Sequence, residues 1–325
     1  MKNFLYTRPN GLENASSILS EGGETSQILA GGTDLLGRMK EYITDVNEVV
    51  NIKDLSGMNQ IDFSRRNGLS IGALVTLTEI AESDTVMENY PILAQAAAEI
   101  ASPQLRNVGT LGGNLNQRPR CWYYREDFDC LKKGGDICYA FDGENKRHAV
   151  IGGGPCFIVH PSDMAVALLA SDAEVVVASG GNTRTMPLQD LYHLPSEDPT
   201  SETTLEPGEI VTEIVVPAPE RNAVSAYLKI KERAVWDFAV VSVGAVLDIR
   251  GNTIRGGKIA FGGVAPIPWT EEAVNSKLSG LSVSDSNIQS IADAALADAS
   301  PLAQNGYKMT MTRNAIISVM QQLTA

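Results

Sequence analysis

The residues best suited to chemistry in this chain are its four cysteines, which share one stretch of thirty-six residues. They are Cys121, Cys130, Cys138 and Cys156, spaced as C-x8-C-x7-C-x17-C. A structural zinc site usually has two C-x2-4-C pairs, because a short turn presents two thiolates to one tetrahedral ion. An iron-sulfur cluster is larger and accepts thiolates from well-separated loop positions. The spacing therefore favours a cluster over zinc, with four buried free thiols as the remaining alternative.

The residues around the cysteines fit a cluster. Glycines at 134, 135 and 152 to 154 leave backbone N–H groups free to approach sulfur atoms. Five basic residues would offset the charge of four thiolates: Arg118, Arg120, Arg125, Lys132 and Lys133. We expect His148 to lie beside the site without being a ligand. No nucleophile motif is present, so we expect the substrate chemistry to occur on another chain.

Two pairs of consecutive glycines form a second candidate site. They lie in "AGGTD" at 30–34 and "TLGGN" at 110–114. The chain has neither G-x-G-x-x-G nor G-x-x-x-x-G-K-[ST], which disfavours a Rossmann turn and a P-loop. Two glycine turns with free N–H groups beside a hydroxyl or amide side chain can hold a pyrophosphate. The alternative for each is a plain tight turn that needs positive φ.

The elements that position these residues alternate between helix and strand. "QILAGGTDLLGRMK" predicts a strand, a glycine turn and a helix, and a strand and helix follow from Asn67. Pro91 begins a further helix. "HPSDMAVALLASDAEVVVASG" predicts a helix and a strand, and "GEIVTEIVVPAP" alternates as a strand does. After Pro217 and Pro219 we predict three antiparallel strands and two closing helices.

Length and charge limit the classes of function. A chain of 325 residues is long enough for two or three packed units. The net charge of −13 argues against nucleic-acid binding, which needs a basic face. We find no signal-peptide h-region and no run of eighteen apolar residues, so we expect no membrane span. We expect a cytoplasmic location, or a periplasmic one if a partner carries the export signal. In a reducing compartment, clustered thiols are ligands or redox groups.

Five segments in order resemble one family. "ILAGGTDLL", "TLGGNLNQ", "HPSDMAVALL", "GEIVTEIVVP" and "YLKIKERAVWDFAVVSVGAVL" are similar to the FAD-binding subunits of molybdenum hydroxylases, the xanthine dehydrogenase and aldehyde oxidoreductase family. The resemblance implies an α+β protein with a vanillyl-alcohol-oxidase-like FAD-binding domain of two α/β subdomains, 1–56 and 57–218. It further implies a C-terminal domain, 219–325, with a three-stranded antiparallel sheet and helices.

The resemblance also implies FAD contacts. Ser162 and Asp163 match a Ser-Asp pair near the flavin, Ile210 and Val211 match apolar positions packed on it, and Lys229 matches a basic residue by the ring. Asp163 as a plain helix cap and Lys229 as a solvated strand residue are the alternatives. The two glycine segments supply the other matching residues: Ile28, Leu29, Ala30, Gly31, Gly32, Thr33, Asp34, Leu35, Thr110, Gly113, Asn114, Asn116 and Gln117.

Residues 118–160 form an insertion relative to the commonest members. It resembles the loop that carries a 4Fe-4S cluster in the flavin subunits of 4-hydroxybenzoyl-CoA reductase and periplasmic aldehyde oxidoreductase. This implies the four cysteines as its ligands. If the insertion is independent, Cys130→Ser should remove the iron and leave FAD in place.

The implied function is electron transfer between 2Fe-2S clusters on a small partner subunit and an external acceptor. A large partner subunit would hold the molybdenum cofactor. The alternatives are a flavin subunit of an aromatic acyl-CoA reductase, a stand-alone flavin oxidoreductase and a zinc-stapled binding module.

Overall fold

The computed structural model describes residues 1–325. Its first unit is a small parallel sheet with strand order β1-β3-β2. Val49 and Val50 of the central strand are buried; Leu35 and Met39 pack beside Val49 from a helix, whereas Val50 belongs to the largest core cluster. The elements are β1 Leu5–Thr7, α1 Leu12–Gly22, β2 Ser26–Leu29, α2 Leu35–Lys40 and β3 Glu48–Asn51, with a 3-10 turn at Gly23–Thr25.

The second unit has a five-stranded antiparallel sheet in the order β4-β5-β8-β6-β7. A capping box between Thr76 and Glu79 begins α3, and Pro91 is the first residue of α5. The elements are β4 Ile61–Ser64, β5 Gly68–Gly72, α3 Leu77–Glu82, α4 Asp84–Asn89, α5 Pro91–Ala98, α6 Pro103–Arg106, α7 Leu111–Leu115, α8 Trp122–Arg125, α9 Asp163–Ala170, β6 Glu174–Ser179, β7 Asn182–Pro187 and β8 Ile210–Val216, with 3-10 turns at Leu131–Lys133 and Leu188–Leu191.

The third unit is an antiparallel sheet with helices. The three predicted strands are β9 Ala223–Ile230, β10 Val241–Arg250 and β11 Thr253–Gly262. Two two-residue strands, β12 Trp269–Thr270 and β13 Leu281–Ser282, also pair with β11. The two predicted closing helices are α11 Asp285–Ala294 and α12 Tyr307–Thr324, and a further helix, α10 Glu272–Leu278, precedes them.

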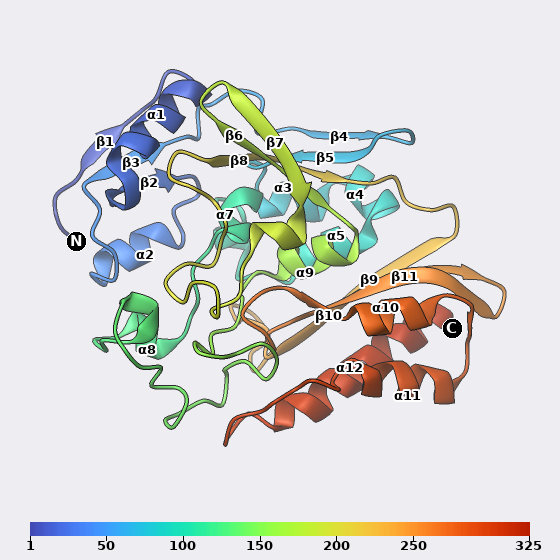
Figure 1. The fold of residues 1–325 in the computed structure, drawn as a ribbon. Helices are drawn as coiled ribbons and strands as arrows, with labels where there is room; N and C mark the ends of the chain where they lie inside the picture. The colour runs from blue at the N-terminus through green and yellow to red at the C-terminus, as the bar shows by residue number, and fades with distance from the viewer.

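The third sheet is covered on both faces. Helix α9 packs on β10 and β11 from the second unit, while α12 packs on β9 and β10 (Figure 1). All eight residues of α9 are buried, which explains its nearly uniform apolar sequence. The contact places the N-terminal end of α9, with Asp163, against the strand that carries Lys229.

The cysteine-rich insertion is mostly irregular and includes the short helix α8, which is labelled in Figure 1. Its later part is fastened to the C-terminal unit. The backbone N–H of Asn145 donates to Gln304, and the N–H of Gln304 donates to Asn145. Asn305 donates to the carbonyl oxygens of His148 and Ala149. The later part of the insertion is therefore held by the C-terminal unit, to which the carbonyl groups of His148 and Ala149 are hydrogen-bonded.

Lys308 of α12 completes this junction. Its buried Nζ donates to the carbonyl oxygens of Arg147 at 2.9 Å, His148 at 3.1 Å and Gly263 at 2.6 Å. Burial lowers the pKa of Lys308 to about 7, and the charge of Arg147 acts in the same direction.

The lowered pKa of Lys308 predicts a pH-dependent stability. Between about pH 7 and the ordinary lysine value near 10 the unfolded chain binds more protons than the folded one, so stability rises with pH across that window. Lys308→Met should remove this part of the slope, although it lowers stability by leaving the carbonyl groups of Arg147 and Gly263 without a donor. Urea unfolding of the wild type and the variant at about pH 7, 8 and 9 measures the slope of stability against pH. Equal slopes in the two chains would contradict the prediction.

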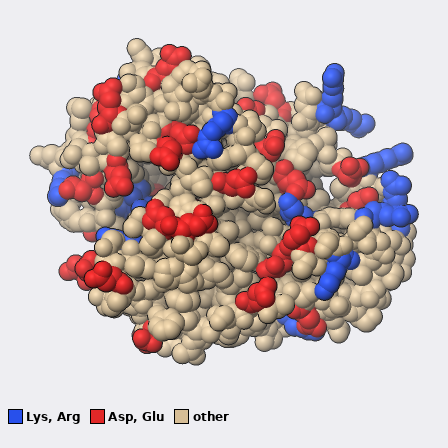
Figure 2. Space-filling view, in the orientation of Figure 1, with Lys and Arg blue, Asp and Glu red and all other residues tan.

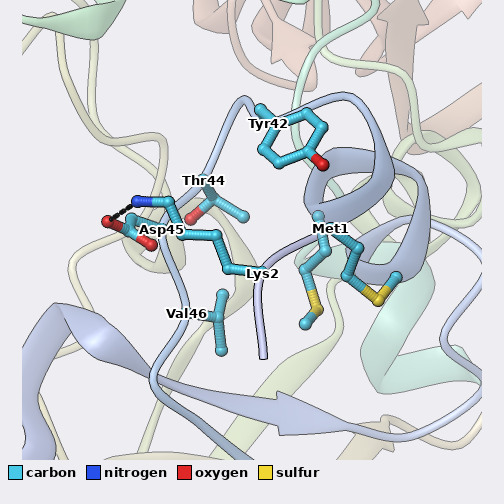
Figure 3. Close-up of a pocket in the computed structure, with 7 residues that line it drawn as sticks. Met1, Lys2, Tyr42, Thr44, Asp45 and Val46 are labelled. Carbon is cyan, nitrogen blue, oxygen red and sulfur yellow. Dashed lines mark hydrogen bonds and ion pairs between the residues drawn. The ribbon is translucent and has the colours of Figure 1, made fainter. Parts of the chain in front are cut away.

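The chain has more acidic than basic residues, which gives the net charge of −13. On the face drawn in Figure 2 the acidic side chains lie in separate groups among uncharged residues. A small pocket of about 40 Å³ lies between the N-terminus and the segment after α2, next to an exposed ion pair of Lys2 with Asp45 (Figure 3). Its size admits a water molecule and no cofactor. None of the helices is both long and apolar enough to span a membrane.

Candidate functional site

One cavity of about 1760 Å³ joins all three units. This exceeds the roughly 300 to 1,000 Å³ of a typical small-molecule pocket and suits a long ligand. Of the predicted cofactor residues, sixteen line it: Ile28, Ala30, Gly31, Gly32, Thr33, Asp34, Leu35, Thr110, Gly113, Asn114, Asn116, Gln117, Asp163, Ile210, Val211 and Lys229. Leu29 and Ser162 do not, because Leu29 packs in the core of the first unit and Ser162 is buried behind Asn114.

The first glycine loop follows β2 and precedes α2, as predicted. None of the backbone N–H groups of residues 31–34 donates a hydrogen bond within the protein. Gly32 has a φ of 73°, which favours glycine. A Cβ on Gly31 would overlap the carbonyl oxygen of Val108 and lie 2.9 Å from Cα of Gly109. The loop thus presents unpaired donors to the cavity and touches the chain leading to the second glycine pair.

The second glycine pair differs from the prediction. Gly112 and Gly113 lie in the short helix α7, and the hydroxyl of Thr110 accepts the N–H of Gly113 at 3.2 Å. The N–H of Gly112 donates to Ala73 O. Both donors are used, so the expectation of free N–H groups in this segment is wrong. Gly112 instead allows close packing, because a Cβ there would lie 2.9 Å from Cβ of Ala73, whereas Gly113 is exposed to the cavity.

A buried ion pair lies in the cavity wall. Lys229 Nζ donates to Asp163 Oδ2 at 2.8 Å, and the two side chains are 1% and 5% exposed. Tyr227 donates its hydroxyl proton to Asp163 Oδ1 at 2.5 Å, and Lys229 also donates to Glu99 O at 3.0 Å. Burial raises the pKa of Asp163, and Lys229 opposes this.

Neither simple alternative for the pair holds. The cap of α9 is Ser162, whose hydroxyl accepts the N–H of Ala165, so Asp163 is not the capping residue. Lys229 is buried and therefore not a solvated strand residue. Ser162 also donates to Asn114 Oδ1 at 2.6 Å, which ties α9 to α7.

The four cysteines are free and lie close together. The thiols of Cys138 and Cys156 interact with each other, and this interaction lowers the pKa of Cys138 to about 6 and raises that of Cys156. Burial raises the pKa of Cys121 to about 11, and charges on Cys138 and Cys130 act in the same direction. The four thiols therefore form one neighbourhood, although they come from separate loop positions.

This neighbourhood is not a site for a single metal ion. No three His, Cys, Asp or Glu side chains are arranged to hold one. His148 Nε2 lies 3.2 Å from Cys121 Sγ, which places His148 beside the thiols. A tetrahedral zinc site needs four donors around one centre, so the zinc-stapled alternative has no geometric support.

The basic residues near the cysteines have other partners than expected. Arg118 and Lys132 pair with Glu202 at 2.6 and 2.7 Å. Arg120 and Arg125 pair with Asp34 at 2.7 and 2.9 Å. Two carboxylates thus balance only half of these four positive charges, and the charge of Lys132 acts to lower the pKa of Cys156. Glu202 gave no signal in the sequence.

Comparison with known proteins identifies the family. Residues 2–219 match the FAD binding domain in molybdopterin dehydrogenase, and residues 226–323 match the CO dehydrogenase flavoprotein C-terminal domain. The chain belongs to the FAD-binding medium subunits of the molybdenum hydroxylase family. Its relatives are FAD subunits of oxidoreductases.

Relatives cover nearly the whole chain. The aldehyde oxidoreductase FAD-binding subunit PaoB of Escherichia coli is 36% identical over 100% of this chain and 99% of its own length. The carbon monoxide dehydrogenase medium chain of Hydrogenophaga pseudoflava is 29% identical over 92% and 88%. A solved carbon monoxide dehydrogenase from that organism has a TM-score of 0.79 at 25% identity over 100% and 99%. A reconstituted CO dehydrogenase from Oligotropha carboxidovorans shares the fold, with a TM-score of 0.79 at 22% identity over 99% and 98%.

The residues of this medium subunit suit FAD. The unpaired N–H groups of residues 31–34 would hold phosphate oxygens, and Gly113 leaves room where a side chain would fill the cavity. Ile210 and Val211 offer apolar contacts at the start of β8. FAD is therefore consistent with both the family and the geometry.

Proposed function

We propose that this chain is the FAD- and 4Fe-4S-binding electron-transfer subunit of a heterotrimeric molybdenum-cofactor oxidoreductase, passing electrons between partner 2Fe-2S clusters and an external acceptor. The observation that carries the proposal is the row of unpaired N–H groups at residues 31–34, in a loop that lines a cavity of about 1760 Å³. Similarity to the E. coli aldehyde oxidoreductase subunit along the entire chain supports an enzyme of that type.

Each predicted FAD residue has a proposed role. The loop at residues 28–35 would bind the pyrophosphate, and the Thr110–Gln117 segment would line the opposite wall through Gly113 and Asn114. Ile210 and Val211 would pack on the ring system, and Lys229 would keep a positive charge near it, held by Asp163. Bound FAD would supply electron exchange in steps of one or two.

The four thiols support the cluster part of the proposal. Cys121, Cys130, Cys138 and Cys156 provide four sulfur donors from separate loop positions, and their long, irregular spacing suits a cluster better than a single ion. His148 would contact Cys121 and orient it without being a ligand. We also propose the boundaries 1–56, 57–218 and 219–325 for the two FAD-binding subdomains and the C-terminal domain, with the insertion at 118–160.

The partners are part of the same proposal. A large molybdenum-cofactor subunit would carry out the substrate reaction, and a small subunit would hold the 2Fe-2S clusters. The names of the relatives, which include FAD-binding subunit and medium chain, support an assembly of several chains. Co-expression with the neighbouring genes should yield a three-chain complex, and turnover by this chain alone would favour a stand-alone flavin oxidoreductase.

Cofactor analysis of the purified chain tests the proposal directly. We expect one FAD per chain and about four irons, because four thiolates fill the four corners of one cluster. Cys130→Ser should lose the iron, and His148→Gln should keep it because all four thiolates remain. Protein-bound iron is measured by anaerobic metal analysis. One zinc without iron would overturn the cluster assignment, and failure to bind added FAD would overturn the flavin assignment.

A further inference from the structure

Asp34 at the end of the first glycine loop is surrounded by donors. Its carboxylate accepts from Arg120 at 2.7 Å, Arg125 at 2.9 Å and Arg38 at 3.2 Å. The backbone N–H of Arg118 adds a fourth hydrogen bond at 3.1 Å. Asp34 is 14% exposed, so these interactions are only partly screened by solvent. Both oxygens of this carboxylate are therefore used by the protein.

The donors come from separate parts of the chain. Arg38 belongs to α2, whereas the segment from Arg118 to Arg125 begins the insertion and includes Cys121. Arg125 also donates to the carbonyl oxygens of Pro119 and Arg118, which fixes the turn before Cys121. Arg120 lies over the ring of Phe238, 5.0 Å from its centroid, in the C-terminal unit. One carboxylate thus joins the flavin loop, the cysteine segment and the third unit.

The carboxylate is ionised at neutral pH. Burial raises the pKa of Asp34, but the guanidinium groups of Arg120, Arg125 and Arg38 outweigh this and hold it below its ordinary value. Arg118 and Lys132 pair in turn with Glu202, so the basic residues of the insertion are held by two carboxylates, those of Asp34 and Glu202. Nothing else in the first glycine loop contacts the insertion through a charged side chain.

We propose that Asp34 is a positioning residue that couples FAD binding to the order of the cysteine segment. The inference rests on the proposed function. The loop must be fixed for its four N–H groups to converge on a pyrophosphate, and the same loop fixes Arg118–Arg125 through Asp34. When one ligand fixes its own site, the ion pairs of Asp34 also help to fix the other site, which lowers the entropy cost of binding there. Binding of FAD and binding of the cluster are therefore cooperative.

The test is a comparison of FAD affinities. In the wild-type chain, the cluster-loaded form should bind FAD at least about fivefold more tightly than the cluster-free form. In Asp34→Asn the FAD affinities of the cluster-loaded and cluster-free forms should agree within about twofold, since the link between the glycine loop and the cysteine segment is broken. A mutation that merely loosened the fold would weaken both forms and preserve their ratio. A ratio in Asp34→Asn equal to that of the wild type would overturn the proposal.

Two further variants, one that removes the partners of Asp34 and one control, support the interpretation of this comparison. Arg120→Gln/Arg125→Gln keeps Asp34 and removes its charged partners, so it should also abolish the difference and serves if Asp34→Asn does not fold. Glu232→Gln is the matched control, because Glu232 also pairs with two cations of the insertion, Lys146 and Arg147, at an exposed position away from the flavin loop. It should leave the difference intact.

A second readout does not depend on iron. Iodoacetamide should alkylate Cys121 and Cys138 of the cluster-free chain more slowly once FAD is added, and Asp34→Asn should remove this protection. An equal effect of FAD in both chains would overturn the coupling. Failure to bind FAD or iron would instead count against the proposed function, whereas independent binding of both by the wild type would count against the coupling alone.

Discussion

Gly31→Val should leave the chain without FAD. A Cβ at this position would overlap the carbonyl oxygen of Val108 and crowd Gly109, and both belong to backbone that cannot move like a flexible side chain. The first glycine loop would have to withdraw from the wall formed by the second unit. Its four unpaired N–H groups would then no longer face the pyrophosphate position. We expect FAD affinity to fall by at least about 100-fold, with a loss of stability typical of overpacking, about 1–3 kcal/mol.

Gly113→Val separates the loss of FAD from the loss of stability. Apart from Thr110 Oγ1 at 3.0 Å, an added Cβ meets no atom and extends into the cavity. This variant should lose FAD with little loss of stability, while Gly256→Val, at a strand position where nothing lies within 4 Å, should keep both. Flavin retained at full occupancy in Gly31→Val and Gly113→Val, measured by absorbance and equilibrium titration, would show that FAD does not bind between these segments.

Local pattern was sufficient for most of the fold. The strand, glycine loop and helix at residues 27–40 follow from an apolar run that ends at two glycines, and the uniformly apolar α9 predicts its own burial. The three long C-terminal strands are as expected. The short strands β12 and β13 are missing from the prediction because two residues carry no alternation.

The second glycine segment shows where pattern fails. Consecutive glycines predict a tight turn by propensity, yet residues 111–115 form a helix. The hydroxyl of Thr110 caps it, and the packing on Ala73 selects glycine at 112 for lack of space. Tertiary contact therefore reverses the local preference, and the distinction between a turn and a packed helix is set by the turn that follows β5, more than thirty residues away.

The charged partners of the site could be predicted least. Asp34 ends the recognisable segment "AGGTD" and Arg38 follows it at i+4, but Arg120 and Arg125 lie in an insertion about ninety residues later, and no local rule pairs them with Asp34. Tyr227 could have been found, since it is two residues before Lys229 on one strand and therefore shares its face. Glu202 and Lys308 lie in segments whose sequence resembles ordinary surface. The partners in such buried ion pairs are therefore identified only in the folded chain.

Lys229→Met should destabilise the folded chain by about 3–5 kcal/mol, because it leaves Asp163 as a buried charge without its partner. Lys229 is 1% exposed, so water cannot replace it. Tyr227 would remain as one donor, which is less than a carboxylate requires. The measurement is urea unfolding of the FAD-free chain, so that lost flavin binding does not contribute to the difference. A change below about 1 kcal/mol would show that the pair is not essential.

The pH dependence of this loss identifies its cause. Burial already raises the pKa of Asp163 against the influence of Lys229, and removing the lysine raises it further. The folded variant then binds a proton that the unfolded chain releases near the ordinary carboxyl value, so its stability falls as pH rises toward the new folded pKa. The destabilisation should therefore be smaller at about pH 5 than at pH 8. The double variant Lys229→Met/Asp163→Asn removes both charges and should recover most of the lost stability at either pH, because no ion is left buried. A double variant no more stable than Lys229→Met would mean that the lost packing of the lysine stem, rather than the charge on Asp163, causes the loss of stability.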